Sequence, residues 1–409
     1  MDFSLLQLKI VPMLFLCLVF SKLDTVIKTL NQNRPSLKEL IVYFLKLGSF
    51  VFGGPVVLCD HMRRDLVENF KWISAQEYSE GFALSQLAPG PLATQLAIYI
   101  GWTRYRNLGA TLIGFAFVLP SFLMVLVLAF LYTSFGGLPW IQSAFYGIGS
   151  AVIAIMILSS HKLATKTFKA DKILWTIGVL SGIATVVTES ENIFFFLIAG
   201  FIVVLSRRLP GLLLSSFIPG WMFIKFSFVS SKADLKDIFL FFVKAGAFVF
   251  GSGLAIVPFL HSGVVTEQHW LTEQQFLDAV AVAMITPGPV VITVAFIGYL
   301  ISGPLGAVIA ALGVFLPCFL FVVFPAPYFS RFAQNLTIKA FVDGVTSAAV
   351  GAIAGATVVL GKRALVDGPS IVLCVVALIL LLKVKRVSEP ILILFAGLIG
   401  YTLKMSGRF

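Results

Sequence analysis

Long apolar runs separated by short polar connectors dominate this chain. They cover residues 37–59, 78–101, 108–134, 139–160, 172–189 and 192–206 in the first half, and 235–260, 276–301, 304–325, 338–360, 369–384 and 389–405 in the second. About 20 apolar residues suffice to cross a bilayer as a helix. The pattern therefore predicts an all-α polytopic membrane protein with about six transmembrane segments in each half.

Two of these runs are interrupted by prolines on either side of a glycine. Pro89-Gly90-Pro91 breaks one run, and Pro287-Gly288-Pro289 breaks another 198 positions later. Each proline removes a backbone donor and clashes with the preceding turn, so neither run continues as one helix. Inside a membrane the freed backbone groups need a partner from protein, water or a solute. Broken helices at matching places in two halves of a chain mark the binding site of many transporters.

The two halves match well beyond this motif. An offset of 198 places Lys46 on Lys244, the segment 50–53 on 248–251, and Trp72 on Trp270, and an offset of 197 places Pro120 on Pro317. These matches predict an internal duplication. We expect an N-terminal extension at 1–34 that lies at the membrane interface, a first repeat at 35–206, a membrane-associated linker at 207–234 and a second repeat at 235–409. Whether the repeats are parallel or inverted depends on whether the linker crosses, and the basic loops do not decide it.

Composition narrows the function classes. The chain is 59% hydrophobic and 12% charged, with a net charge of +11, and its basic residues lie in short loops beside the apolar runs. Topogenic lysines and arginines explain this charge, so we expect no nucleic-acid partner and place the protein in the plasma membrane. The four cysteines and four histidines show no metal-ligand spacing, and no nucleophile–base pair stands out. We expect no cofactor, no metal and no enzymatic activity.

Two lysines and four glycines form the first candidate site. Lys46 and Lys244 lie at equivalent depths in their runs, where a cation tends to face a polar cavity, although snorkelling to the headgroups is the alternative. The glycine-rich breaks that follow allow close approach of backbone N–H groups to a ligand, or simply tight helix packing. Together with a helix restarting after each proline motif, they suit an anion. The glycines concerned are Gly53, Gly54, Gly251 and Gly253.

Polar and acidic side chains flank the proline motifs. Gln86 and Thr94 lie beside the first, and Thr286 and Thr293 beside the second. Their hydroxyls and amide can bind an oxyanion or can cap the broken helices. Glu80 and Asp278 each lie nine residues before their motif, where a carboxylate can carry a proton for coupling or can stabilise a helix N-terminus.

The motifs FVFGGP, LSQLAPGP, FVFGSGLAIVPFL and AVAMITPGPVVITVAFIGYL resemble those of the chromate ion transporter family, in its long, two-domain form. The resemblance runs from about residue 37 to residue 403. It implies a secondary transporter that exports chromate, a divalent tetrahedral oxyanion, with protons as the coupling ion, and that confers chromate resistance.

Three alternatives stay open at this stage. A transporter or importer of sulfate or a related oxyanion would share the fold, and an uncoupled anion channel would need no proton site. A membrane-embedded enzyme is disfavoured by the missing catalytic set. The sequence does not decide the oligomeric state, and a homodimer is one option.

Overall fold

The computed structural model describes residues 35–52, 55–135, 139–189, 193–208, 234–248, 250–251, 256–329, 335–383 and 389–405, nearly all of them helical. The first half holds α2 (Leu37–Phe50), α3 (Pro55–Met62), η1 (Arg63–Asn69), α4 (Ala75–Leu87), β1 (Gly90–Pro91), α5 (Leu92–Phe135), α6 (Pro139–Phe168), α7 (Lys172–Thr188) and α8 (Ile193–Arg208). The second half holds α9 (Leu235–Phe248), β2 (Phe250–Gly251), α10 (Val257–His261), η4 (Ser262–Glu267), α11 (Glu273–Ile285), η5 (Val290–Ile292), α12 (Thr293–Val323), η6 (Ala326–Tyr328), α14 (Leu336–Ala364), α15 (Gly368–Lys383) and α16 (Glu389–Met405).

The first elements of each half fold back on themselves. The Tyr105 hydroxyl donates a 2.8 Å hydrogen bond to the carbonyl of Pro35, just before α2. Arg104 donates to the carbonyl of Trp72, between η1 and α4, at 2.8 and 3.1 Å. The start of α2, the start of α4 and residues 104–105 therefore meet at one end of the molecule. We define α2–α3, and α4 with the first limb of α5, as the two hairpins of the first half.

Helices α5 and α12 each contain the reversal that completes such a hairpin. Arg106 has a φ of 50°, and in α12 Gly303 has a φ of 64°. Across the reversal, Gly101 packs against the backbone of Gly109, just as Gly298 packs against Gly306. Each helix thus has a short first limb (92–104 and 293–301) and a long second limb (107–135 and 304–323).

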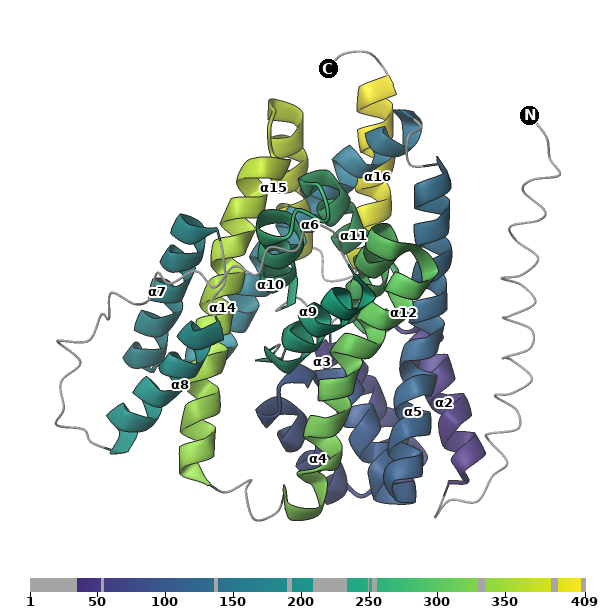
Figure 1. Ribbon diagram of the computed structural model, residues 1–409, viewed down its shortest axis with the longest axis vertical. Coiled ribbons are helices and arrows are strands. Elements are labelled where there is room, and N and C mark those ends of the chain that lie inside the picture. The colour runs from purple at the N-terminus through teal and green to yellow at the C-terminus, as the bar shows by residue number, and fades with distance from the viewer. Residues whose placement is uncertain are drawn as a thin grey trace.

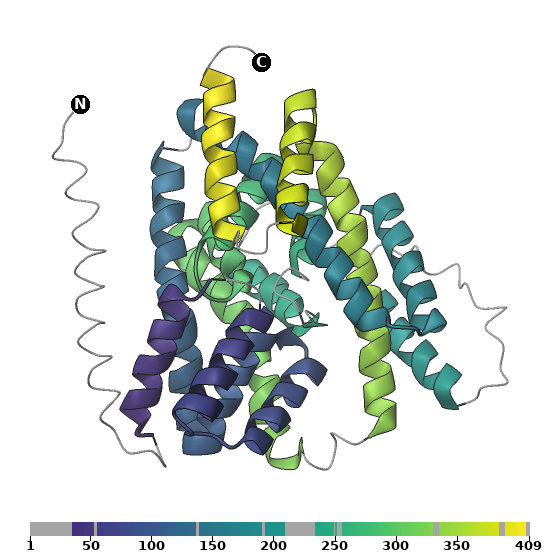
Figure 2. The same ribbon diagram turned by 180° about the vertical axis from the view of Figure 1, so that it is seen from behind.

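The two halves are inverted relative to each other. In Figure 1 the second limb of α5 runs upward from its reversal, while that of α12 runs downward. Helix α6 starts at the top and α14 starts at the bottom, and the reverse view shows the same arrangement (Figure 2). The hairpins of the first half fill the lower part of the molecule, and α9–α11 lie above them. Inverted halves around a central site are typical of secondary transporters.

Beyond the hairpins, each half packs on the other. Gly351 of α14 meets the backbone of Gly178 on α7, and Gly147 of α6 meets Ala396 on α16. Helices α6 and α14 also touch, at the equivalent positions Ser160 and Thr357, whose hydroxyl oxygens lie 3.3 Å apart. Glycine permits this close approach because it has no side chain. The two halves are therefore intertwined.

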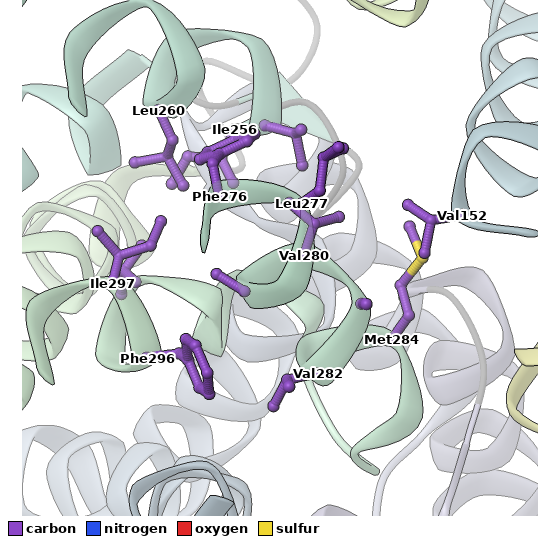
Figure 3. Close-up of a cluster of buried hydrophobic side chains, with 14 of the residues drawn as sticks. Val152, Ile256, Leu260, Phe276, Leu277, Val280, Val282, Met284, Phe296 and Ile297 are labelled. Atoms are coloured by element: carbon purple, nitrogen blue, oxygen red, sulfur yellow. The ribbon is translucent and has the colours of Figure 1, made fainter. Parts of the chain in front are cut away.

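The core of the molecule surrounds α11. Figure 3 shows Phe276, Leu277, Val280, Val282 and Met284 of this region among side chains of α6, α10 and α12. Most of these side chains are fully buried, including Phe276, Val280 and Phe296. Every residue of α11 from Phe276 to Met284 is buried, so this part of the helix is enclosed by protein rather than exposed at the surface.

Four helices among the described residues are long and apolar enough to cross a membrane: residues 92–135, 142–168, 290–328 and 336–364. Exposed apolar side chains cover the outer helices, with Phe130, Val187, Phe201 and Leu398 more than half exposed. An apolar exterior of this kind suits lipid.

This architecture differs from six crossings in each half. The first two apolar runs of each half form hairpins that begin and end on one side, because their central breaks end the helices. The question of parallel or inverted repeats is answered in favour of inversion. The N-terminal extension and most of the linker lie outside the described residues, so the expectations for them stay predictions.

The inverted arrangement can be tested at one equivalent pair of positions. Asn107 and Pro304 follow the two reversals and are both exposed. We expect Asn107→Cys and Pro304→Cys, each as the single cysteine, to react with a membrane-impermeant maleimide from opposite faces of oriented vesicles. Reaction of both from the same face would show that the halves are parallel.

Candidate functional site

The proline motif of each half lies against the glycine-rich break of the other half. Strand β1 pairs in parallel with β2, with Gly90 opposite Phe250 and Pro91 opposite Gly251. On the other side, the amide of Gly288 donates a 3.1 Å hydrogen bond to the carbonyl of Val51. Backbone groups of each break thus find partners in the other half of the chain.

Only glycine fits the centre of each motif. Gly90 has a φ of 139° and Gly288 a φ of 92°, a region that side chains rarely adopt. A Cβ atom on Gly90 would lie 2.5 Å from Nε2 of Gln95, and one on Gly288 would overlap the hydroxyl of Ser121. Both tips, by which we mean residues 89–91 and 287–289, are therefore tightly enclosed.

The first turn after the first tip contains polar atoms that lack a partner. Thr94 and Gln95 are 1% and 0% exposed. Oγ1 of Thr94 and Oε1 of Gln95 have no hydrogen-bond partner within the part of the chain that the structure describes. Burying such atoms costs about 1–3 kcal/mol each, so a buried pair beside a helix N-terminus indicates a place where a ligand or water binds.

The threonines of the second tip are satisfied locally. The hydroxyl of Thr286 donates to the carbonyl of Ala283 at 3.0 Å, and that of Thr293 donates to the carbonyl of Val290 at 2.7 Å. Gln86, by contrast, is exposed beside the first tip. The structure therefore brings Thr94, Thr286 and Thr293 to the tips but leaves only Thr94 with its hydroxyl available.

The space between the tips is closed in this conformation. It measures about 10 Å³, which holds about one water molecule. A tetrahedral oxyanion does not fit without a movement of the tips. The lining residues are Pro55, Leu58, Pro91, Ala93, Gly288, Pro289, Val290 and Val291.

The two candidate lysines occupy different environments. Lys46 is half-buried in the last part of α2, whereas Lys244 is exposed on α9. The two lysines therefore differ in burial although their sequence positions are equivalent. Gly251 belongs to β2 and lies opposite the first tip, whereas Gly53, Gly54 and Gly253 lie outside the described residues.

The two candidate carboxylates differ as well. Asp278 is only 4% exposed; it accepts hydrogen bonds from the Tyr132 hydroxyl at 2.7 Å and from Nε2 of Gln274 at 2.8 Å. Glu80 is half-buried and accepts from Nε2 of Gln76 at 3.1 Å. Sequence reasoning missed Tyr132, which comes from the far end of α5, in the other half of the chain.

An ionic cluster lies at the end of the molecule where α11 begins. His261 Nε2 is 2.8 Å from Oε2 of Glu273, and Arg363 contacts both Glu273 and Glu189. Burial, and secondly the nearby Arg363, lower the pKa of His261 to about 4, so its imidazole is neutral near pH 7. The cluster then carries two negative charges and one positive charge, so it links helices and does not attract anions.

Comparison with known proteins shows clear relatives. A family model described as chromate transporter matches residues 38–205 and 236–401. The chain is 55% identical over 371 residues to a chromate transport protein of Cupriavidus metallidurans, covering 89% of this chain and 92% of that protein. It is 51% identical to a probable chromate transport protein of Synechococcus elongatus, covering 89% and 95%. It is 32% identical to a chromate transport protein of Pseudomonas aeruginosa, covering 90% and 92%. No solved structure matches the chain.

The enclosure of the second tip predicts the effect of adding one methyl group there. We expect Gly288→Ala to destabilise the protein by about 2 kcal/mol, because it combines an unfavourable φ with a clash. Gly303→Ala is the matched control, since Gly303 also has a positive φ but has open space around its Cβ position. Thermal unfolding in detergent measures both, and an equal loss in the two variants would contradict the tight packing of the tip.

Proposed function

Because this chain belongs to the chromate transporter family, we propose that it is a secondary active transporter that exports chromate from the cell, driven by the proton gradient, and so confers chromate resistance. We further propose that the protein lies in the plasma membrane. The protein is an integral membrane protein and not an enzyme.

The observation that supports a substrate site at the tips is that Oγ1 of Thr94 and Oε1 of Gln95 have no hydrogen-bond partner among the described residues. The Thr94 hydroxyl can donate to an oxyanion, and the amide groups at the start of α5 point toward the same tip. The positive end of the helix dipole favours negative charge there. Gln95 Oε1 can accept a hydrogen bond from a bound water or from a protonated oxyanion.

In this proposal the remaining candidates line the path of the substrate. Lys46 and Lys244 provide positive charge near the ends of α2 and α9, and the glycine-rich breaks, with Gly53, Gly54, Gly251 and Gly253, provide backbone donors. Gln86 lies at the exposed side of the first tip, while Thr286 and Thr293 shape the second. The lysines bring the anion in, and the tips hold it.

The closed space between the tips supports alternating access. A cavity of about 10 Å³ admits no oxyanion, so the tips must part for transport to occur. Inverted halves allow the opening on one face to be mirrored on the other by equivalent elements. We assign the described conformation to the closed state between the two openings.

Asp278 is the favoured proton carrier. It is buried and is held by two neutral donors. Among the residues that the structure describes, no cation pairs with Asp278. Such a carboxylate takes up a proton readily, because burial disfavours its charged form. Glu80, at the equivalent position, is more exposed, and the residue equivalent to Tyr132 is Phe329, which has no hydroxyl to donate.

Direction, coupling and selectivity can be measured in one preparation. We expect inside-out vesicles that contain the protein to accumulate chromate when a proton gradient is present and to stop when an uncoupler collapses it. Excess sulfate should slow the uptake only weakly. Uptake that is unaffected by the uncoupler would indicate a channel, and strong competition by sulfate would indicate a broader oxyanion transporter.

Substitutions at the proposed site should reduce this uptake. We expect Thr94→Val, Lys46→Gln and Lys244→Gln each to lower the initial rate about tenfold at low chromate, since a hydrogen bond to a charged group contributes roughly 1.5–3 kcal/mol. Thr357→Val and Lys383→Gln are controls away from the tips. Equal rates in site and control variants, at equal amounts of protein in the membrane, would contradict the site.

The coupling role of Asp278 predicts a different phenotype. We expect Asp278→Asn to abolish gradient-driven accumulation while chromate exchange between the two sides continues, because the site still binds substrate without moving protons. Glu80→Gln should keep most of the coupling. The measurement compares accumulation with counterflow, and gradient-driven accumulation by Asp278→Asn would exclude this residue as the carrier.

A further inference from the structure

The two tips are held by different side chains. Ser121 is fully buried in the second limb of α5, and its hydroxyl donates a 2.7 Å hydrogen bond to the carbonyl of Pro287 in the second tip. The same oxygen lies 3.3 Å from the carbonyl of Gly48 on α2. One hydroxyl of the first half therefore connects the second tip to both α5 and α2.

The equivalent residue at the first tip is Cys318. It is fully buried in the second limb of α12, 197 positions after Ser121, and its Sγ lies 3.3 Å from where a Cβ on Gly90 would be. Helices α5 and α12 pack side by side, so each supplies one such residue to the tip of the other half. A thiol is a weak donor, and no hydrogen bond joins Cys318 to the other described residues.

The proline carbonyls at the two tips also differ in where their hydrogen-bond partners come from. The carbonyl of Pro287 is satisfied from the other half of the chain, by Ser121. The equivalent carbonyl of Pro89 is satisfied within its own hairpin, by Nε2 of Gln95 at 2.7 Å. Moving the second tip away from α5 therefore leaves a buried carbonyl without a partner, whereas the first tip keeps this bond when it moves.

We propose that Ser121 is a positioning residue that fastens the second tip to the first half, and that the thiol at position 318 leaves the first tip as the one that opens more readily. This inference deepens the proposed transport function, because alternating access requires one tip to part before the other. The asymmetry determines which face of the closed protein opens first. Backbone pairing also joins each tip to the other half, through the β1–β2 pair at the first tip and through the Gly288 amide at the second. The asymmetry proposed here concerns the side chains that hold the tips.

Two equivalent positions can report the opening of each tip. Ala93 and Val291 are related by the offset of 198, line the space between the tips and are 2% and 0% exposed. In a parent with alanine in place of the four native cysteines, Ala93→Cys and Val291→Cys react with a small impermeant methanethiosulfonate only when a tip opens. The rate of reaction at each reporter cysteine is measured without chromate, in vesicles of both orientations, so that the reagent reaches each face of the protein.

We expect Ala93→Cys to react about tenfold faster than Val291→Cys. Adding Ser121→Ala should raise the rate at Val291→Cys about tenfold and leave that at Ala93→Cys within about twofold. Cys318→Ser, used in place of Cys318→Ala, should slow the rate at Ala93→Cys several-fold, because the new hydroxyl can bond the first tip. Ser160→Ala is the matched control, since Ser160 is a buried serine that bonds the carbonyl of Met156 in its own helix, and it should change neither rate.

Two results would overturn the inference. One is equal reaction at the two reporter positions in the parent, and the other is a comparable rise at both positions after Ser121→Ala, which would mean general loosening. Chromate flux is measured separately in the same vesicles. Asymmetric labelling without chromate transport would contradict the proposed function alone, whereas chromate transport with symmetric labelling would contradict this inference alone.

Discussion

The structure depends on one constraint: backbone that leaves the helix inside a membrane protein must find hydrogen-bond partners within the protein. Each half of this chain contains two such breaks, and backbone groups at both tips bond the other half. Gly90 and Pro91 pair with Phe250 and Gly251 of the second half, and the amide of Gly288 bonds the carbonyl of Val51 in the first. Two halves are needed because an isolated half would leave these groups unsatisfied in an apolar surrounding.

The same dependence extends to the outer helices. Helix α14 of the second half packs on α7 and α8 of the first, and α6 of the first half packs on α15 and α16 of the second. Close contacts between glycines, such as Gly351 with Gly178, hold these pairs together. These helices pack on one another without using the tips, so the contacts between them do not depend on the tips staying closed.

Much of this could be predicted from the sequence, and the missing parts have physical reasons. The proline motifs and their offset of 198 located both tips, because proline and glycine act locally on the backbone. Hydropathy did not distinguish a hairpin from a crossing helix, since the two bury similar apolar side chains. Tyr132 and Ser121 were missed because they reach Asp278 and Pro287 from the other half of the chain. Lys46 and Lys244 looked equivalent, yet only Lys46 is half-buried, because burial depends on neighbouring helices that have diverged between the halves.

The central claim is that the substrate binds where the two tips meet. A cryo-electron microscopy map of the protein in lipid nanodiscs, with and without saturating chromate, tests it most directly. We expect additional density between residues 89–91 and 287–289, in contact with Thr94, together with a widened space between the tips. Chromate density elsewhere in the protein, with the tips still closed, would contradict it.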